Sequence, residues 1–148
     1  MTELSASSAK VFDEPELRHL LSREVQRCTR YQDFLTLCLL RPGRPGESLS
    51  EVTAAAIRRI VELLRATDIV GTVGSDIVVL LVHTPDSDAR LIADRIRDGV
   101  GWESLPPGEP GRTALRIGLA SFPTDATSDD GLLAHALAQV QAGPREID

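Results

Sequence analysis

Residues 65–82 read RATDIVGTVGSDIVVLLV, and this stretch decides the fold of the chain. Two runs rich in β-branched residues, Asp68–Val73 and Asp76–Val82, flank the pair Gly74-Ser75. A glycine-containing pair between two such runs is typical of the two-residue turn of a β-hairpin. The second run is wholly apolar after Asp76, which is typical of a strand covered on both faces. We therefore predict an antiparallel hairpin whose second strand is central in the sheet.

The segments on either side of the hairpin alternate between helical and extended patterns. Before it, the sequence predicts a helix over 14–31, a buried strand over 34–40, a Pro/Gly-rich loop over 41–46 and a helix over 49–66. After it, we expect a helix opened by Thr84-Pro85, a strand over 113–121, a helix capped by Thr127 that runs to about Ala142, and a short edge strand in the tail 143–148. This order predicts one α/β (α+β) domain over residues 13–148, with a ferredoxin-like sheet covered by helices, after a flexible arm over residues 1–12.

The composition is that of an ordinary globular domain and excludes several classes of function. The 148 residues are 42 % hydrophobic and 26 % charged, with a net charge of −6, which argues against a general nucleic-acid binder. No apolar run is long enough for a membrane span, and the polar N-terminus lacks the apolar core of a secretory signal. Cys28 and Cys38 have no metal-ligand spacing, so we expect two buried free thiols in a reducing cytoplasm.

Five segments, in order along the chain, resemble the GGDEF family of diguanylate cyclases. They are the first helix at 24–31 with the apolar strand after it, the strand entering the signature hairpin at 68–70, the "A…lAeriR" helix at 89–97, the "SiGva" strand at 116–120 and the "Ll..AD.AL" helix at 132–137. The resemblance covers about residues 14–147 and implies a nucleotidyl-cyclase-type, GGDEF-like fold. It also implies that the turn Gly74, Ser75, Asp76, Ile77 and Val78 is a degenerate form of the family signature.

The residues that the resemblance implies for catalysis are largely missing. Active members use two carboxylates to hold Mg²⁺ or Mn²⁺ against GTP, one at the end of the first strand and one in the signature turn. The chain has Leu40-Arg41-Pro42 at the first position, and Ile77-Val78 replace the Glu-Phe pair of the second. Asp76 alone is either a residual metal ligand or a turn residue that bonds its own backbone. We expect no catalytic residues, no metal and no diguanylate cyclase activity.

A second site of the family is better preserved. The resemblance implies an inhibitory product site with the motif RxxD, ending five residues before the signature turn, and Arg65 and Asp68 have this spacing. Alignment of the "AeriR" helix places Arg95 as the third residue of this I-site, with Arg97 as a possible additional one. Arginine forks and a carboxylate suit the guanine edges and phosphates of cyclic di-GMP. The alternative is that Arg65 favours a helix C-terminus and pairs with Asp68, while Arg95 and Arg97 form a solvated helix face.

These observations lead to three hypotheses for the function. The first is an inactive GGDEF-like domain that binds cyclic di-GMP through Arg65, Asp68 and Arg95, and signals by ligand-dependent contact with a protein partner or a second copy. The second is a nucleotide-independent interaction or dimerisation module. An active diguanylate cyclase is the hypothesis that these residues support least.

Overall fold

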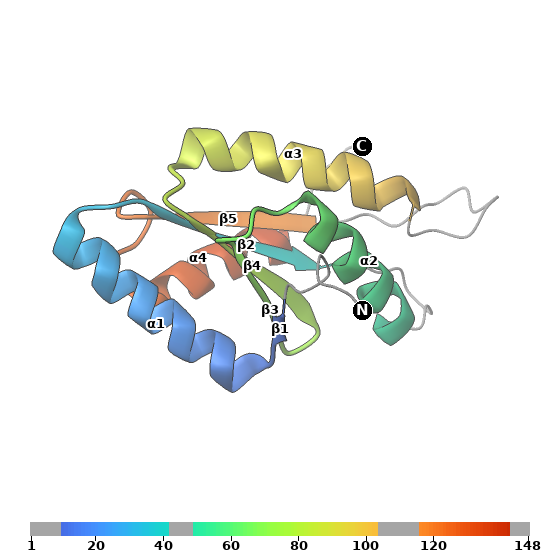
Figure 1. Ribbon diagram of the computed structural model, residues 1–148, viewed down its shortest axis with the longest axis horizontal. Helices are drawn as coiled ribbons and strands as arrows, with labels where there is room; N and C mark the ends of the chain where they lie inside the picture. The colour runs from blue at the N-terminus through green and yellow to red at the C-terminus, as the bar shows by residue number, and fades with distance from the viewer. Residues whose placement is uncertain (1–9, 42–48, 104–115, 143–148) are drawn as a thin grey trace.

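The computed structural model describes residues 10–41, 49–103 and 116–142, and Figure 1 shows their arrangement. The elements in these ranges are β1 (Val11–Phe12), α1 (Glu14–Tyr31), β2 (Leu35–Arg41), α2 (Leu49–Leu63), β3 (Ile69–Val73), β4 (Asp76–Val82), α3 (Asp86–Glu103), β5 (Arg116–Phe122) and α4 (Asp129–Ala142). The predicted edge strand in the tail 143–148 and most of the predicted loops lie outside the described residues.

The five strands form one mixed sheet in the order β1-β3-β4-β2-β5. The pairs β3–β4, β4–β2 and β2–β5 are antiparallel, and β1 alone pairs in parallel, with β3. The segment from β2 to β5 is a β-α-β-β-α-β unit whose strands have the ferredoxin-like order. This confirms the predicted α+β fold, the hairpin and the central place of β4.

Helices cover both faces of the sheet, α1 and α4 on one and α2 and α3 on the other (Figure 1). Side chains of a strand alternate between faces, so β2 and β4 contribute to both cores. Leu37 and Leu80 pack with α1 and α4, whereas Leu40 and Leu81 pack with α2 and α3. Every residue of β4 and all of β2 except Arg41 are buried, as expected for strands covered on both faces.

The sheet topology places the two candidate sites at opposite ends. Because β3 and β4 are antiparallel, the residues just before β3 and just after β4 lie at the same end. The Gly74-Ser75 turn lies at the other end, where β2 also finishes, since Leu40 pairs with Ile77. The RxxD motif and the signature turn are therefore separated by the length of the hairpin.

The first helix is predicted correctly, from Glu14 to Tyr31. Asp13 caps it by accepting a hydrogen bond from the Glu16 N–H at 3.1 Å, and Pro15 lies in the first turn, where its missing N–H costs nothing. Cys28 on this helix and Cys38 on β2 are buried and unpaired, and burial raises the pKa of the Cys38 thiol to about 12. Both cysteines are therefore core residues, as we predicted.

Several predicted boundaries are wrong by a few residues, for local reasons. Helix α2 ends at Leu63 rather than Ala66, because the Arg65 N–H bonds the Asp68 carboxylate instead of continuing the helix. Helix α3 begins at Asp86, and the Pro85 carbonyl accepts its first helical hydrogen bond from the Ala89 N–H, so the helix opens at Pro85 rather than at Thr84. Helix α4 is capped by Ser128, not Thr127, since the Ser128 Oγ accepts from the Gly131 N–H at 3.0 Å.

Two strand predictions also need correction. Phe34 was expected in the buried strand, but β2 begins at Leu35 and Phe34 is 45 % exposed. Val11 and Phe12 were assigned to the flexible arm, yet they form β1 and pair with Val70 and Gly71. Residues 1–9 of the arm lie outside the described residues. Within the described ranges, no helix is both long and apolar enough to cross a membrane.

Candidate functional site

The signature turn forms a tight two-residue connection between β3 and β4. Val73 pairs with Asp76, and Gly74 has a φ of 61°, in the left-handed region that glycine adopts without strain. The Gly74 N–H donates to Glu14 Oε1 at 3.0 Å, so α1 supports the turn. This turn exposes Gly74 and Ser75 but turns Asp76 inward.

Asp76 forms an ion pair with Arg41 at the end of β2. Arg41 Nε donates to Asp76 Oδ1 at 2.7 Å, and Arg41 Nη2 donates to Oδ2 at 2.9 Å. The Asp76 side chain is only 9 % exposed, and the carboxylate raises the pKa of Arg41 through these hydrogen bonds. Asp76 is thus not a turn residue bonded to its own backbone. No pattern in the sequence pairs Asp76 with Arg41, which lies where the family resemblance places a carboxylate.

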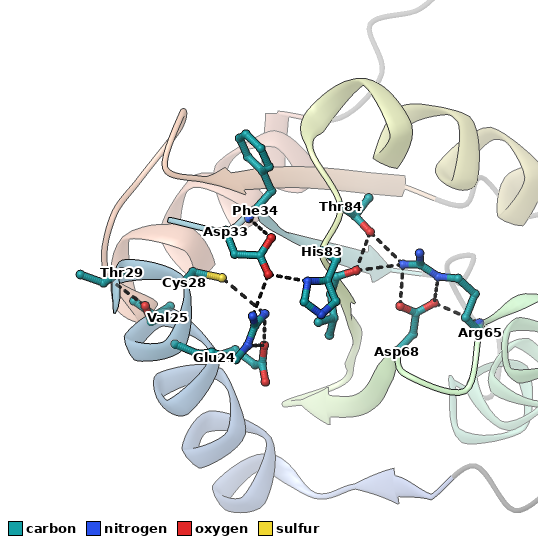
Figure 2. A network of polar contacts seen from close by, with 12 residues as sticks. Glu24, Val25, Cys28, Thr29, Asp33, Phe34, Arg65, Asp68, His83 and Thr84 are labelled. Carbon is teal, nitrogen blue, oxygen red and sulfur yellow. Dashed lines mark hydrogen bonds and ion pairs between the residues drawn. The ribbon is translucent and has the colours of Figure 1, made fainter. Parts of the chain in front are cut away.

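Arg65 and Asp68 form a second two-pronged ion pair, at the other end of the sheet (Figure 2). Arg65 Nη2 donates to Asp68 Oδ1 at 2.9 Å, and Arg65 Nε donates to Oδ2 at 3.2 Å. The Arg65 backbone N–H also donates to Oδ2, at 3.0 Å. Both oxygens of Asp68 therefore have partners within the motif, and the Asp68 side chain is 1 % exposed. This is the ion pair that we considered as the alternative to a ligand site.

The end of β4 holds the same guanidinium from its other side. Arg65 Nη2 donates to the Val82 carbonyl at 3.1 Å and to Thr84 Oγ1 at 2.8 Å (Figure 2). Among the described residues, Arg65 Nη1 has no hydrogen-bond partner, and the side chain remains 51 % exposed. The hydrogen bonds to Asp68 raise the pKa of Arg65 despite partial burial. The guanidinium is thus fixed in orientation while part of it faces solvent.

A cavity of about 580 Å³ lies beside this pair. Its walls come from the end of α2, the start of β3 and the segment around β1, and the polar residues that line it are Lys10, Arg65, Thr67 and Asp68. Neither Arg95 nor Arg97 lines it. The cavity therefore joins the motif to β1, an element that the sequence analysis did not predict.

The structure does not bring Arg95 and Arg97 into contact with the motif. Both lie exposed on α3, and Arg95 is nine residues beyond the first residue of that helix, about 13 Å along its axis. Arg97 lies 3.6 Å from Asp94 on the same helix. In the parts of the chain that the structure describes, no hydrogen bond or ion pair joins either arginine to Arg65 or Asp68.

A second polar cluster lies next to the motif and includes His83 (Figure 2). Asp33 Oδ2 pairs with His83 Nδ1 and accepts from Arg27 Nη1 at 2.7 Å, while Oδ1 accepts from the Phe34 N–H at 2.7 Å. Burial alone would raise the pKa of Asp33, but these partners lower it. His83 directly precedes Thr84 and has a φ of 59°. The cluster ties the end of α1 to the segment that supports Arg65, and no short-range pattern in the sequence reveals it.

Comparison with known proteins identifies the fold. No family model and no curated protein matches the chain. Among solved structures, the GGDEF domain of PA1120 (TpbB or YfiN) from Pseudomonas aeruginosa is 23 % identical over 93 % of this chain and 86 % of its own, with a TM-score of 0.73. The active GGEEF domain of a diguanylate cyclase from Vibrio cholerae is 14 % identical over 90 % of each chain, with a TM-score of 0.75. Diguanylate cyclase SiaD of P. aeruginosa, solved in complex with its activator SiaC, is 18 % identical over 93 % of this chain and 58 % of its own, with a TM-score of 0.73. The chain therefore has the fold of a GGDEF domain.

Proposed function

We propose that this chain is a GGDEF-like domain that does not synthesise cyclic di-GMP but binds it, through Arg65. The observation that carries the proposal is the pair of two-pronged arginine–carboxylate contacts at opposite ends of the hairpin. One of them occupies the carboxylate of the signature turn, and the other holds an arginine in place beside a cavity.

The contact between Arg41 and Asp76 supports the proposed absence of catalysis. Cyclisation of GTP by the family requires divalent cations held by two carboxylates against the triphosphate. Here the first position is an arginine, and its guanidinium already neutralises the one carboxylate that remains. A cation would have to displace Arg41, which is hydrogen-bonded to both oxygens of the buried Asp76 carboxylate, and would gain a single ligand. The donor set thus does not fit the metal that the fold implies.

The binding of a ligand is supported by the fixed orientation of Arg65. Asp68, Val82 and Thr84 restrain its guanidinium before any ligand arrives, which reduces the entropy lost on binding. Nη1, which bonds none of the residues that the structure describes, can donate to a guanine or phosphate oxygen, and the guanidinium plane can stack on a base. In this arrangement Asp68 positions Arg65 rather than accepting from a guanine edge, because both of its oxygens are engaged. Cyclic di-GMP presents both guanines and phosphates.

Isothermal titration calorimetry with cyclic di-GMP tests this proposal. We expect saturable binding to the wild-type domain and loss of binding in Arg65→Ala. Arg58→Ala is the matched control, since Arg58 is an exposed arginine on α2, two turns before Arg65. Absence of binding to the wild type, or equal affinity of Arg65→Ala, would overturn the receptor proposal. GTP incubated with Mg²⁺ or Mn²⁺ should yield no cyclic di-GMP, and turnover by pure protein would overturn the proposed inactivity.

A second candidate is a nucleotide-independent interaction module. It is favoured by the exposed aromatic side chains at the end of α1, where Tyr31 is 67 % and Phe34 is 45 % exposed. The structure of SiaD with its activator gives an example of a protein containing this fold that binds another protein. If Arg65→Ala lowers stability while the wild type binds no cyclic di-GMP, Arg65 is structural and this candidate replaces the receptor.

A further inference from the structure

The cavity beside Arg65 is also lined by a second basic residue, Lys10, which immediately precedes β1. Lys10 reaches this position because β1 pairs in parallel with β3, so the residue before β1 lies near the residues before β3. The RxxD motif occupies those residues before β3. Two segments more than fifty residues apart in the sequence thus contribute cations to one cavity.

Lys10 supplies the net positive charge of this cavity. Arg65 and Asp68 lie in its wall as an ion pair, so their charges largely cancel. The remaining charged side chain of the described lining is Lys10. A ligand with an anionic group at this cavity therefore meets Lys10, whose partner Glu16 does not line the cavity, beside the restrained side chain of Arg65.

The contacts that Lys10 makes within the protein are weak enough to be exchanged for a ligand. Its ammonium lies 3.8 Å from the Glu16 carboxylate, and the two side chains are 64 % and 50 % exposed. It also lies 5.1 Å from the centre of the Phe12 ring, at cation–π distance. An exposed ion pair of this length contributes little to stability, so breaking it costs little. The Phe12 ring meanwhile keeps the ammonium near the cavity.

We propose that Lys10 provides the second cationic contact of the site, to a phosphate of the bound cyclic dinucleotide. This inference rests on the proposed function. Arg65 and Lys10 together match a ligand with two phosphates. Arg95, which the family resemblance suggested for this role, lies outside the cavity and makes no described contact with the motif.

The test is calorimetric titration of cyclic di-GMP into the wild type and three variants. Lys10→Met removes the charge and keeps the length of the side chain, and we expect affinity to fall about five- to tenfold. Lys10→Arg keeps the charge and should bind within about twofold of the wild type. Arg95→Met removes a charge from an exposed helix position and should also stay within about twofold, because screening weakens distant charges. All these positions are exposed, so the variants should fold.

The outcomes separate this inference from the proposed function. If Arg65→Ala abolishes binding while Lys10→Met binds as the wild type does, the receptor stands and the role of Lys10 is refuted. If Arg95→Met weakens binding as much as Lys10→Met, the effect is one of overall charge, and the specific contact is refuted. If the wild type does not bind cyclic di-GMP, both proposals fail.

Discussion

The ion pair between Arg41 and Asp76 should stabilise the end of the hairpin measurably, and its removal gives a quantitative test. Loss of one partner of a fully buried pair costs about 3–5 kcal/mol, because the other charge is left uncompensated. Exposed pairs contribute only about 0.2–1 kcal/mol. The Asp76 side chain is 9 % exposed and that of Arg41 is 36 % exposed, so the pair lies between these limits but nearer the buried one. We expect Arg41→Met to lower the free energy of unfolding by about 2–3 kcal/mol.

A double-mutant cycle isolates the interaction itself. Arg41→Met, Asp76→Asn and the double variant are unfolded with urea, and the free energies are compared at equal slopes. We expect a coupling energy of about 1.5–2.5 kcal/mol, because the double variant no longer buries a lone charge. The matched control is the exposed pair of Arg90 and Asp86 on α3, for which about 0.5 kcal/mol or less is expected. A coupling energy at Arg41–Asp76 no larger than in this control would refute the argument that the guanidinium holds the carboxylate.

Three further predictions concern other parts of the fold. The partners of Asp33 lower its pKa, so its contribution to stability is complete above its pKa in the unfolded chain and is lost as pH falls through its pKa in the folded protein. The difference in unfolding free energy between the wild type and Asp33→Asn should therefore be present at pH 7 and should narrow below about pH 4. A difference that stays constant down to about pH 2 would contradict this. A Cβ at Gly118 would lie 2.1 Å from a main-chain oxygen of α4, so Gly118→Ala should lower the free energy of unfolding by at least about 3 kcal/mol or prevent folding. A Cβ at Gly74 meets open space, so the control Gly74→Ala should lower it by only about 1–2 kcal/mol, because of the positive φ. Equal stability of the two variants in thermal denaturation would contradict the packing of α4 on β5. Among the strands that the structure describes, β5 lies at the edge, and the side-chain amide of Gln139 forms two hydrogen bonds with its backbone at Leu119. Gln139→Ala should therefore lower stability by about 1 kcal/mol. It should also leave these backbone groups without their partner, visible as concentration-dependent self-association in sedimentation experiments that the wild type does not show.

The fold could be predicted because its signals are local. The apolar periodicity of residues 14–31, the continuous apolar run after Asp76 and the Gly74-Ser75 pair each define an element within a short window. Strand β1 could not be predicted in this way. It has two residues, and the reason it forms is its pairing with Val70 and Gly71, far away in the sequence.

Contacts within the candidate site could be predicted only where the residues are close in sequence. Arg65 and Asp68 belong to one turn, and their pairing follows from their spacing. Arg41 meets Asp76 because of the register between β2 and β4, and Thr84 meets Arg65 because β4 ends beside the start of β3. Contacts of this kind depend on tertiary structure, and no motif in the sequence encodes them.

We propose that the domain keeps a ligand site at one end of the hairpin and lacks a catalytic turn at the other end. NMR spectra of the uniformly ¹⁵N-labelled domain, recorded during titration with cyclic di-GMP, test both parts at once. We predict that the backbone amide signals of Lys10, residues 65–69 and Thr84 shift saturably, while those of residues 74–78 stay unchanged. Unchanged spectra at saturating ligand, or shifts concentrated at residues 74–78, would contradict the account.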